Sequence, residues 1–262
     1  MKRLEGRRAI ITGAGSGIGR ASALRFASEG AHVLVVGRTR ESLAETVDLV
    51  RAAGGIAEYF VADATRESDV AAAVAFCLEK FAGLEICFAN AGNTDSMVPL
   101  FEQTVESWET QYRDNVISAF LAVKHAGRHM VPRGVGSIIL NSSTGSLRAN
   151  GGTLAYSVAK AGVNSLTMGA AASLAGTGVR VNAVLPGLTE TKLTQATFDY
   201  ARAKGSESKL GALTLLKRPG KVEDIAAVAA FLASDDAAYV DGQLIAADGG
   251  ISSTHPFGRF VL

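Results

Sequence analysis

The chain has 262 residues, of which 48% are hydrophobic and 19% charged, and its formal net charge is +1 at pH 7. This composition is typical of a globular enzyme and excludes a disordered chain or a basic nucleic-acid-binding protein. Two cysteines give no disulfide framework, the scattered histidines lack metal-ligand spacing, and neither a signal peptide nor a membrane-spanning run is visible. We therefore expect a cytoplasmic protein that binds no metal, no membrane and no nucleic acid.

The predicted elements alternate between strand and helix along the chain. Short apolar runs predict strands at residues 8–12, 32–36, 57–61, 86–89, 137–142, 179–184 and 244–247. Helical patterns follow most of them, at residues 20–28, 40–53, 67–81, 107–130 and from 154 onward. The pattern predicts an α/β fold: a single Rossmann-like, doubly wound, seven-stranded parallel sheet with helices on both faces, forming one domain over residues 1–262.

A glycine-rich turn separates the first strand from the first helix. Its glycines, Gly13, Gly17 and Gly19, are spaced Gly-x-x-x-Gly-x-Gly, and no Walker lysine follows. Glycines allow the backbone to approach a pyrophosphate closely, and the helix N-terminus favours its negative charge. The turn therefore predicts a dinucleotide site, with a loop that binds no ligand as the alternative.

A tyrosine and a lysine four residues apart begin the helix after the fifth strand. Tyr156 and Lys160 fall on one helical face, where the lysine ammonium can favour the phenolate form of the tyrosine. Ser143 follows the apolar run 138–140, so its hydroxyl is expected at the carboxyl edge of the sheet. These residues predict an acid/base site, against the alternative of a half-buried ring beside a solvated charge.

Several motifs in this order resemble the short-chain dehydrogenase/reductase family over almost the whole chain. The resemblance is carried by Thr12-Gly13-x-x-x-Gly17-Ile18-Gly19, Asn90-Ala91-Gly92, Asn115, Ser143, Tyr156-x-x-x-Lys160, Pro186-Gly187-Leu188-Thr189-Glu190-Thr191 and Asp248-Gly249-Gly250. It implies a nicotinamide-dependent oxidoreductase with the cofactor and substrate sites on the same domain.

The resemblance implies a role for each of four catalytic residues. Tyr156 would give a proton to the substrate oxygen during ketone reduction and take it back during alcohol oxidation. Lys160 would lower the phenol pKa and hold the nicotinamide ribose, and Ser143 would bind the reacting oxygen. Asn115 would hold a water for proton relay toward Lys160. From the residues alone, Asn115 can equally be a polar residue that distorts its helix.

The cofactor implied by the resemblance is NADP(H), with NAD(H) as a possibility. Gly37 stands where NAD-preferring relatives present an acidic residue, and Arg38 beside it can pair with a 2′-phosphate. Ser16 stands where some NADP-preferring relatives carry a second basic residue. The implied contacts are Gly13, Ser16, Gly17, Ile18, Gly19, Arg38, Thr39, Asp63, Ala64, Asn90, Ala91, Gly92, Tyr156, Lys160, Pro186, Gly187, Thr189 and Thr191.

The substrate is expected to be a ketone or secondary alcohol with apolar substituents. Residues 189–215 correspond to the family's substrate lid, and Leu147, Leu154, Leu185 and Leu193 suggest an apolar pocket in which Gly151 and Gly152 leave room beside Tyr156. A 3-oxoacyl thioester of acyl carrier protein is the alternative, for which a basic docking patch would come from Lys192, Arg202, Lys204 and Lys209. A catalytically silent cofactor-binding protein is less favoured because Ser143, Tyr156 and Lys160 are all retained.

The segment 161–178 is apolar or small on nearly every side. A helix of this kind is usually buried all round, whereas a monomer would expose one flank of it. We therefore expect a subunit contact there and a homo-oligomer, a dimer or tetramer, with purely internal packing as the alternative. From the sequence, the tail 255–262 can reach a neighbouring subunit or cap a pocket, with a disordered terminus as the alternative.

Overall fold

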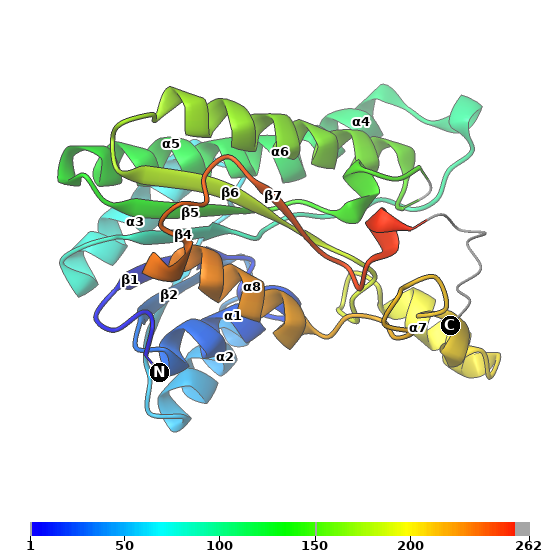
Figure 1. Cartoon of the computed structure of the whole chain (residues 1–262), viewed down its shortest axis with the longest axis horizontal. Coiled ribbons are helices and arrows are strands. Elements are labelled where there is room, and N and C mark those ends of the chain that lie inside the picture. Colours follow the sequence, from blue (N-terminus) through cyan, green and yellow to red (C-terminus); the bar gives the residue numbers. More distant parts are fainter. Residues whose placement is uncertain (1, 150, 255–262) are drawn as a thin grey trace.

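The computed structural model describes residues 2–149 and 151–254, so the predicted role of the tail 255–262 lies outside the described residues. Seven parallel strands form one sheet in the order β3-β2-β1-β4-β5-β6-β7 (Figure 1). The strands are β1 (Arg8–Thr12), β2 (His32–Gly37), β3 (Ile56–Val61), β4 (Ile86–Ala89), β5 (Gly136–Asn141), β6 (Val179–Pro186) and β7 (Leu244–Ala247). The predicted fold class is confirmed.

Helices cover both faces of the sheet (Figure 1). One face packs against α1 (Gly17–Ser28), α2 (Arg40–Ala52) and α8 (Val222–Ala233). The other packs against α3 (Glu67–Phe81), α5 (Ser118–Met130) and α6 (Leu154–Ser173). Two shorter helices, α4 (Val105–Tyr112) and α7 (Gln195–Ala203), lie toward the carboxyl ends of the strands.

Successive strand residues enter different hydrophobic cores. Ile11 and Val33 pack into the core beneath α1, α2 and α8, whereas Ile10 and Leu34 pack into the core beneath α3, α5 and α6. Strand side chains alternate between faces, so a parallel sheet covered on both sides needs the continuous apolar runs found in the sequence.

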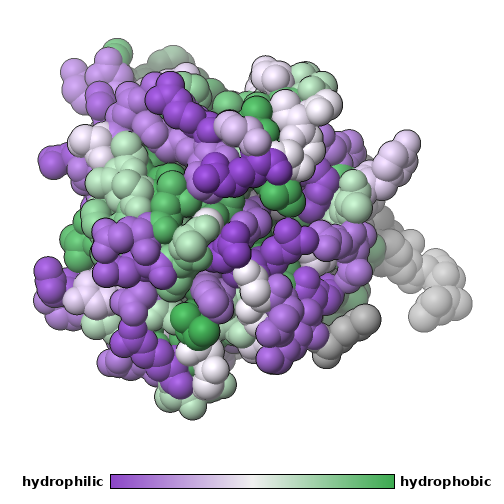
Figure 2. Space-filling view, turned by 90° about the vertical axis from the view of Figure 1, so that its left-hand side faces the viewer, coloured by the Kyte–Doolittle hydropathy of each residue, from purple (hydrophilic) through white to green (hydrophobic). Residues whose placement is uncertain are grey.

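The strand order reverses between β1 and β4, which pair with each other although β2 and β3 intervene in the chain. Open α/β sheets bind ligands in the crevice at such a reversal, beyond the carboxyl ends of the strands. The glycine turn after β1 and the segment Asn90–Gly92 after β4 flank this crevice. Hydrophilic residues are spread over much of the opposite face, at the amino ends of the strands (Figure 2).

The predicted helix over residues 107–130 is interrupted. Between α4 and α5 the residues Arg113–Ile117 form a π-helical turn. Asn115 is at the centre of this turn and is buried.

One helix was missed in the sequence. No element was predicted between residues 216 and 243, where the structure has α8, an alanine-rich helix with six of its twelve residues buried. The segment 161–178 exposes one flank in the single chain, as expected: Ala161, Ser165, Met168 and Ala172 lie on an exposed flank of α6.

Within residues 2–149 and 151–254, no helix is both long enough and apolar enough to cross a membrane. The same residues contain no cluster of three histidine, cysteine or acidic side chains with metal-binding geometry. Cys77 and Cys87 are buried free thiols.

Candidate active site

A cavity of about 470 Å³ opens at the carboxyl ends of β5 and β6. Its wall contains Ser143 and Tyr156, together with Gly151, Gly152 and residues of the segment 186–197. The structure thus brings into one cavity residues that are far apart in the sequence.

Tyr156 and Lys160 are both held on the inner side of α6. Thr153 caps the helix by accepting a hydrogen bond from the backbone N–H of Tyr156. One turn later, Lys160 is 3% exposed, its Nζ lies 5.6 Å from the centre of the Tyr156 ring, and it donates to the carbonyl of Asn141 at 2.8 Å. The predicted helical geometry of this pair is present.

Burial controls the protonation of both groups. It lowers the pKa of Lys160 to about 8, because the ammonium loses its hydration. It also raises the pKa of Tyr156, with a smaller opposing effect from a hydrogen bond with Ser143. In the protein by itself, desolvation therefore sets the direction of the pKa shift of Tyr156, and the expected lowering by Lys160 is not found. The phenol stays protonated at neutral pH, which is the form required of a proton donor.

Ser143 is oriented by the turn that follows β5. Its Oγ accepts the backbone N–H of Gly145 at 3.0 Å, which caps a short 3₁₀ turn. A hydroxyl that accepts one hydrogen bond still has its own O–H to donate. Ser143 can therefore donate to an oxygen placed next to the Tyr156 hydroxyl.

Asn115 is fixed by the loop that follows β4. Its Nδ2 donates to the carbonyls of Asn93 and Gln111, each at 3.0 Å, and its Oδ1 accepts the N–H of Asn93 at 3.3 Å. A Cβ added to Gly92 would meet Asn115 Oδ1 at 2.7 Å and Lys160 Nζ at 3.2 Å. The absence of a side chain at Gly92 therefore lets the amide of Asn115 and the ammonium of Lys160 approach the same point.

The glycine turn fits a pyrophosphate. Gly13 and Gly17 have φ of +65° and +54°, a conformation that favours glycine, and a Cβ on Gly19 would lie 2.4 Å from the carbonyl of Gly13. Ser16 makes no capping hydrogen bond to the first turn of α1, and that turn carries no acidic side chain. Its backbone N–H groups and the positive end of the helix are thus available to an anion.

The segment Asn90–Gly92 ties three strand ends together. Asn90 Nδ2 donates to the carbonyl of Thr12 at 2.9 Å, and the N–H of Ala91 donates to Thr12 Oγ1 at 3.0 Å. Asn141 at the end of β5 donates to Asn90 Oδ1 at 3.0 Å. These contacts hold the crevice between β1 and β4 in a fixed shape.

A second cavity, at the ends of β1 to β3, collects the residues predicted to bind adenosine. Gly37, Arg38, Asp63 and Ala64 line it, and Arg38 is exposed. Hydrogen bonds from Thr65 to Asp63 hold the pKa of that carboxyl below its usual range, and Arg38 adds a smaller electrostatic contribution. Thr39 directly precedes α2 and makes no capping hydrogen bond.

The segment that follows β6 closes the crevice from the other side. A Cβ on Gly187 would lie 2.8 Å from Asp248 Cα, and Thr189 Oγ1 donates to the carbonyl of Gly187 at 3.0 Å. A Cβ on Gly17 would meet the side chain of Thr191 at 3.4 Å. The two predicted cofactor segments, the glycine turn and residues 186–191, therefore face each other.

The predicted apolar pocket is made largely by other residues. Of the four leucines suggested from sequence, Leu193 lines the cavity, whereas Leu147 and Leu154 are about half exposed and Leu185 is buried in the core. The cavity wall also contains Thr94, Met97 and Ile251, which sequence reasoning missed because no predicted motif includes them. Leu188, Thr194 and Thr197 complete the wall and come from the predicted segments 186–191 and 189–215.

Gly152 is the point at which the cavity is most sensitive to added volume. A Cβ there would lie 2.8 Å from Tyr156 Cδ1, so Gly152→Ala is expected to displace the ring and lower kcat/KM by about 100-fold. Gly127→Ala on α5 is the matched control, because its Cβ would meet Ile138 and Leu174 at an ordinary 3.9 Å. Steady-state kinetics of both variants, with circular dichroism to check folding, test this; equal activities would contradict it.

Comparison with known proteins agrees with this geometry. The family model described as enoyl-(acyl carrier protein) reductase matches residues 13–252. The cis-4-hydroxycyclohexanecarboxylate dehydrogenase of Sinomonas cyclohexanicum is 37% identical, over 94% of this chain and 96% of its own length. The 3-oxoacyl-[acyl-carrier-protein] reductase FabG of Thermotoga maritima is 36% identical, over 95% of this chain and 99% of its own length.

A solved structure extends the likeness to three dimensions. The crystal structure of levodione reductase superposes with a TM-score of 0.91 at 32% identity, covering 97% of this chain and all of that one. The names of these relatives and of this structure are those of dehydrogenases and reductases, and each match extends over more than nine-tenths of this chain. The chain belongs to the short-chain dehydrogenase/reductase family of oxidoreductases, which use nicotinamide cofactors.

Proposed function

We propose that this protein is an NADP(H)-dependent ketone reductase and alcohol dehydrogenase in which Tyr156 is the general acid and base. The observation that carries the proposal is the meeting of Ser143 and Tyr156 in one cavity wall, directly above buried Lys160 and next to a glycine turn that fits a pyrophosphate. A binding protein without catalysis would not need this acid/base arrangement.

Each polar group has a defined task in the proposed reaction. The nicotinamide, when bound, supplies the hydride that the carbonyl carbon accepts. Ser143 donates its hydroxyl to the substrate oxygen, where negative charge develops, and Tyr156 transfers its proton to that oxygen. Lys160 favours the phenolate that is left behind, and Asn115 holds a water through which the proton is replaced.

The substrate we propose is an uncharged ketone or secondary alcohol with apolar substituents. Among the described residues that line the cavity, none is acidic, basic or histidine. A buried carboxylate without a cationic partner is strongly destabilised, so a substrate acid would bind poorly here. The carboxylate named in the substrate of the Sinomonas relative would need a cation that the described wall does not provide.

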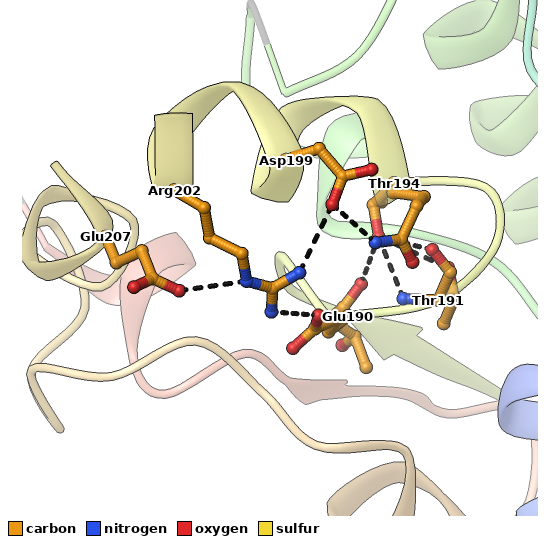
Figure 3. Close-up of polar contacts among 8 residues, drawn as sticks. Glu190, Thr191, Thr194, Asp199, Arg202 and Glu207 are labelled. Atoms are coloured by element: carbon orange, nitrogen blue, oxygen red, sulfur yellow. Dashed lines mark hydrogen bonds and ion pairs between the residues drawn. The ribbon is translucent and has the colours of Figure 1, made fainter. Parts of the chain in front are cut away.

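Reduction of a 3-oxoacyl thioester on acyl carrier protein is the second candidate, favoured by the 36% identity to the Thermotoga enzyme. The basic patch expected for docking is weakened in the structure. Arg202 pairs with Glu190, Asp199 and Glu207, so its charge is compensated (Figure 3). Lys192, Lys204 and Lys209 remain as the exposed cations of that patch.

The same contacts support a substrate lid over residues 189–215. Arg202 on α7 pairs with Glu190 at the base of the segment, and Thr194 Oγ1 donates to the carbonyl of Thr189 at 2.6 Å (Figure 3). Helix α7 is thereby attached to the residues that face the glycine turn. We propose that movement of this segment admits substrate and cofactor together.

Initial rates with NADPH and NADH across aliphatic, aryl and 3-oxoacyl ketones test the proposal, with Tyr156→Phe as the blank. We expect oxidation of NADPH with neutral apolar ketones, and lower rates when the ketone carries a carboxylate. Turnover confined to 3-oxoacyl thioesters would favour the second candidate. Tight cofactor binding without turnover of any ketone would contradict an enzymatic function.

We also propose a homo-oligomer that buries the exposed flank of α6. Met168 and Val158 are about half exposed on this flank, and an apolar groove of about 540 Å³ separates α6 from α5. A second copy of the chain would cover this surface by the symmetric pairing common in oligomers.

Sedimentation velocity at micromolar concentration is expected to show a dimer or tetramer. Met168→Glu should shift the distribution toward monomer, because a charge would be placed in the contact. Leu49→Glu is the control: Leu49 is also partly exposed but lies on α2, which covers the other face of the sheet, so this change should have no such effect. A clean monomer in the wild-type protein would remove the proposed contact.

A further inference from the structure

The loop after β4 is fastened to the start of the catalytic helix. Thr153 Oγ1 donates a hydrogen bond to Asp95 Oδ1, although the two residues are far apart in sequence. The same oxygen accepts the backbone N–H of Tyr156 at 3.4 Å as the cap of α6. Asp95, Thr153 and Tyr156 therefore form a chain of contacts that ends at the proposed general acid.

The direction of these hydrogen bonds gives Asp95 a specific effect. A threonine hydroxyl has one hydrogen, and in Thr153 this hydrogen is donated in the hydrogen bond to the carboxylate of Asp95. The lone pairs of Thr153 Oγ1 are then turned toward the N–H of Tyr156, which a freely rotating hydroxyl would satisfy only part of the time. The negative charge of Asp95 also lies at the N-terminus of a 20-residue helix, where the helix dipole favours it.

The same loop carries part of the cavity wall. Thr94 and Met97, on either side of Asp95, line the cavity that contains Ser143 and Tyr156. The amide of Gln111, with its nitrogen toward the carbonyl of Asn93, accepts the N–H of Asp95 at 3.2 Å. The backbone of Asp95 is thus held by Gln111 of α4, and its side chain is held by Thr153 at the start of α6.

We propose that Asp95 is a positioning residue for the reaction, acting on Tyr156 through Thr153 and on the substrate through the placement of Thr94 and Met97. The inference rests on the proposed function, because it assigns Asp95 a role in that same site. Two results are expected. Loss of Asp95 should lower kcat and raise KM for the ketone, while the affinity for the cofactor should not change. The glycine turn and the Arg38 region share no contact with Asp95 in the described residues.

The test compares four variants with the wild-type enzyme. Asp95→Ala is expected to lower kcat/KM for the ketone by about 10- to 100-fold, the range expected when a reacting group is slightly misplaced. Asp95→Asn, which keeps an oxygen that can accept from Thr153, should recover most of the loss. Thr153→Val should resemble Asp95→Ala, and Thr153→Ser should resemble the wild type.

Coupling between the two residues separates positioning from general destabilisation. The double variant Asp95→Ala, Thr153→Val should be no slower than the slower single variant, because both changes break the same chain of contacts. The cofactor Kd, measured by NADPH fluorescence, should stay within about twofold in every variant. Ser96→Ala, in the same loop and with an exposed side chain, is the matched control and should behave as the wild type.

Three results would overturn the inference: unchanged kcat/KM in Asp95→Ala, effects that multiply in the double variant, or a cofactor Kd that weakens in step with turnover. If Asp95→Ala does not fold, the contrast between Thr153→Val and Thr153→Ser decides, because an equal loss in both would exclude the hydroxyl's role. A wild-type enzyme that reduces no ketone would instead mark failure of the proposed function.

Discussion

Replacement of Tyr156 by phenylalanine is expected to lower kcat for ketone reduction by a factor of about 10²–10⁴, the usual contribution of a positioned general acid. The phenyl ring fills the same space beside Gly152 and keeps the packing of the cavity wall. What is lost is the phenolic proton, which is present at neutral pH because the ordinary pKa of tyrosine is about 10 and burial raises the pKa of Tyr156 further. Ser143 can still donate to the substrate oxygen, but it cannot replace this proton transfer.

Cofactor binding should survive this substitution. Tyr156 does not line the cavity that contains Gly13 and Arg38. Lys160 also keeps its hydrogen bond to the carbonyl of Asn141. The measurement is kcat and KM for the ketone together with the Kd for NADPH by fluorescence titration. Tyr239→Phe, on a fully exposed side chain, is the control and should leave all three unchanged. Retention of turnover in Tyr156→Phe would eliminate the proposed mechanism.

The fold could be predicted from sequence because its determinants are local. Each strand of a parallel sheet that is covered on both faces is an uninterrupted apolar run, and β1, β4 and β7 have the predicted bounds. The glycine turn was recognisable for a similar reason. The positive φ angles at positions 13 and 17 favour glycine, so the residue types alone indicate the turn.

Features that depend on distant residues could not be predicted in this way. The π-helical turn at Arg113–Ile117 coincides with a side-chain hydrogen bond from Asn115 to Asn93 in the loop after β4. The raised pKa of Tyr156 depends on how deeply the cavity buries it, whereas its spacing from Lys160 alone suggested the opposite direction. The sequence placed Arg202 in a basic patch, whereas in the structure three carboxylates surround its guanidinium (Figure 3).

The cofactor preference depends on a contrast between two adjacent residues. Gly37 presents no carboxylate to an adenosine ribose, and Arg38 is an exposed guanidinium beside the cavity formed by Asp63 and Ala64. Guanidinium groups bind phosphate through paired, charge-assisted hydrogen bonds. In the proposed function this pair of residues selects the cofactor with a 2′-phosphate.

Arg38→Asp is therefore expected to lower kcat/KM for NADPH by about 10- to 100-fold, the value of one or two hydrogen bonds to a charged group, and to leave NADH nearly unaffected. The new carboxylate repels the 2′-phosphate and can accept from the ribose hydroxyls of NADH. Gly37→Asp tests the same site independently, because its Cβ would meet Leu43 at 3.4 Å, an ordinary contact. The ratio of kcat/KM for the two cofactors is the measurement.

Arg40→Asp is the matched control for net charge, since it makes the same change two residues away, where the arginine lies over the ring of Tyr59. If long-range electrostatics set the preference, Arg40→Asp and Arg38→Asp would change the cofactor ratio equally. If Arg38 binds the 2′-phosphate directly, only Arg38→Asp and Gly37→Asp would do so. An unchanged ratio in both of these variants would show that the preference is determined elsewhere, and Ser16 in the glycine turn would become the next position to test.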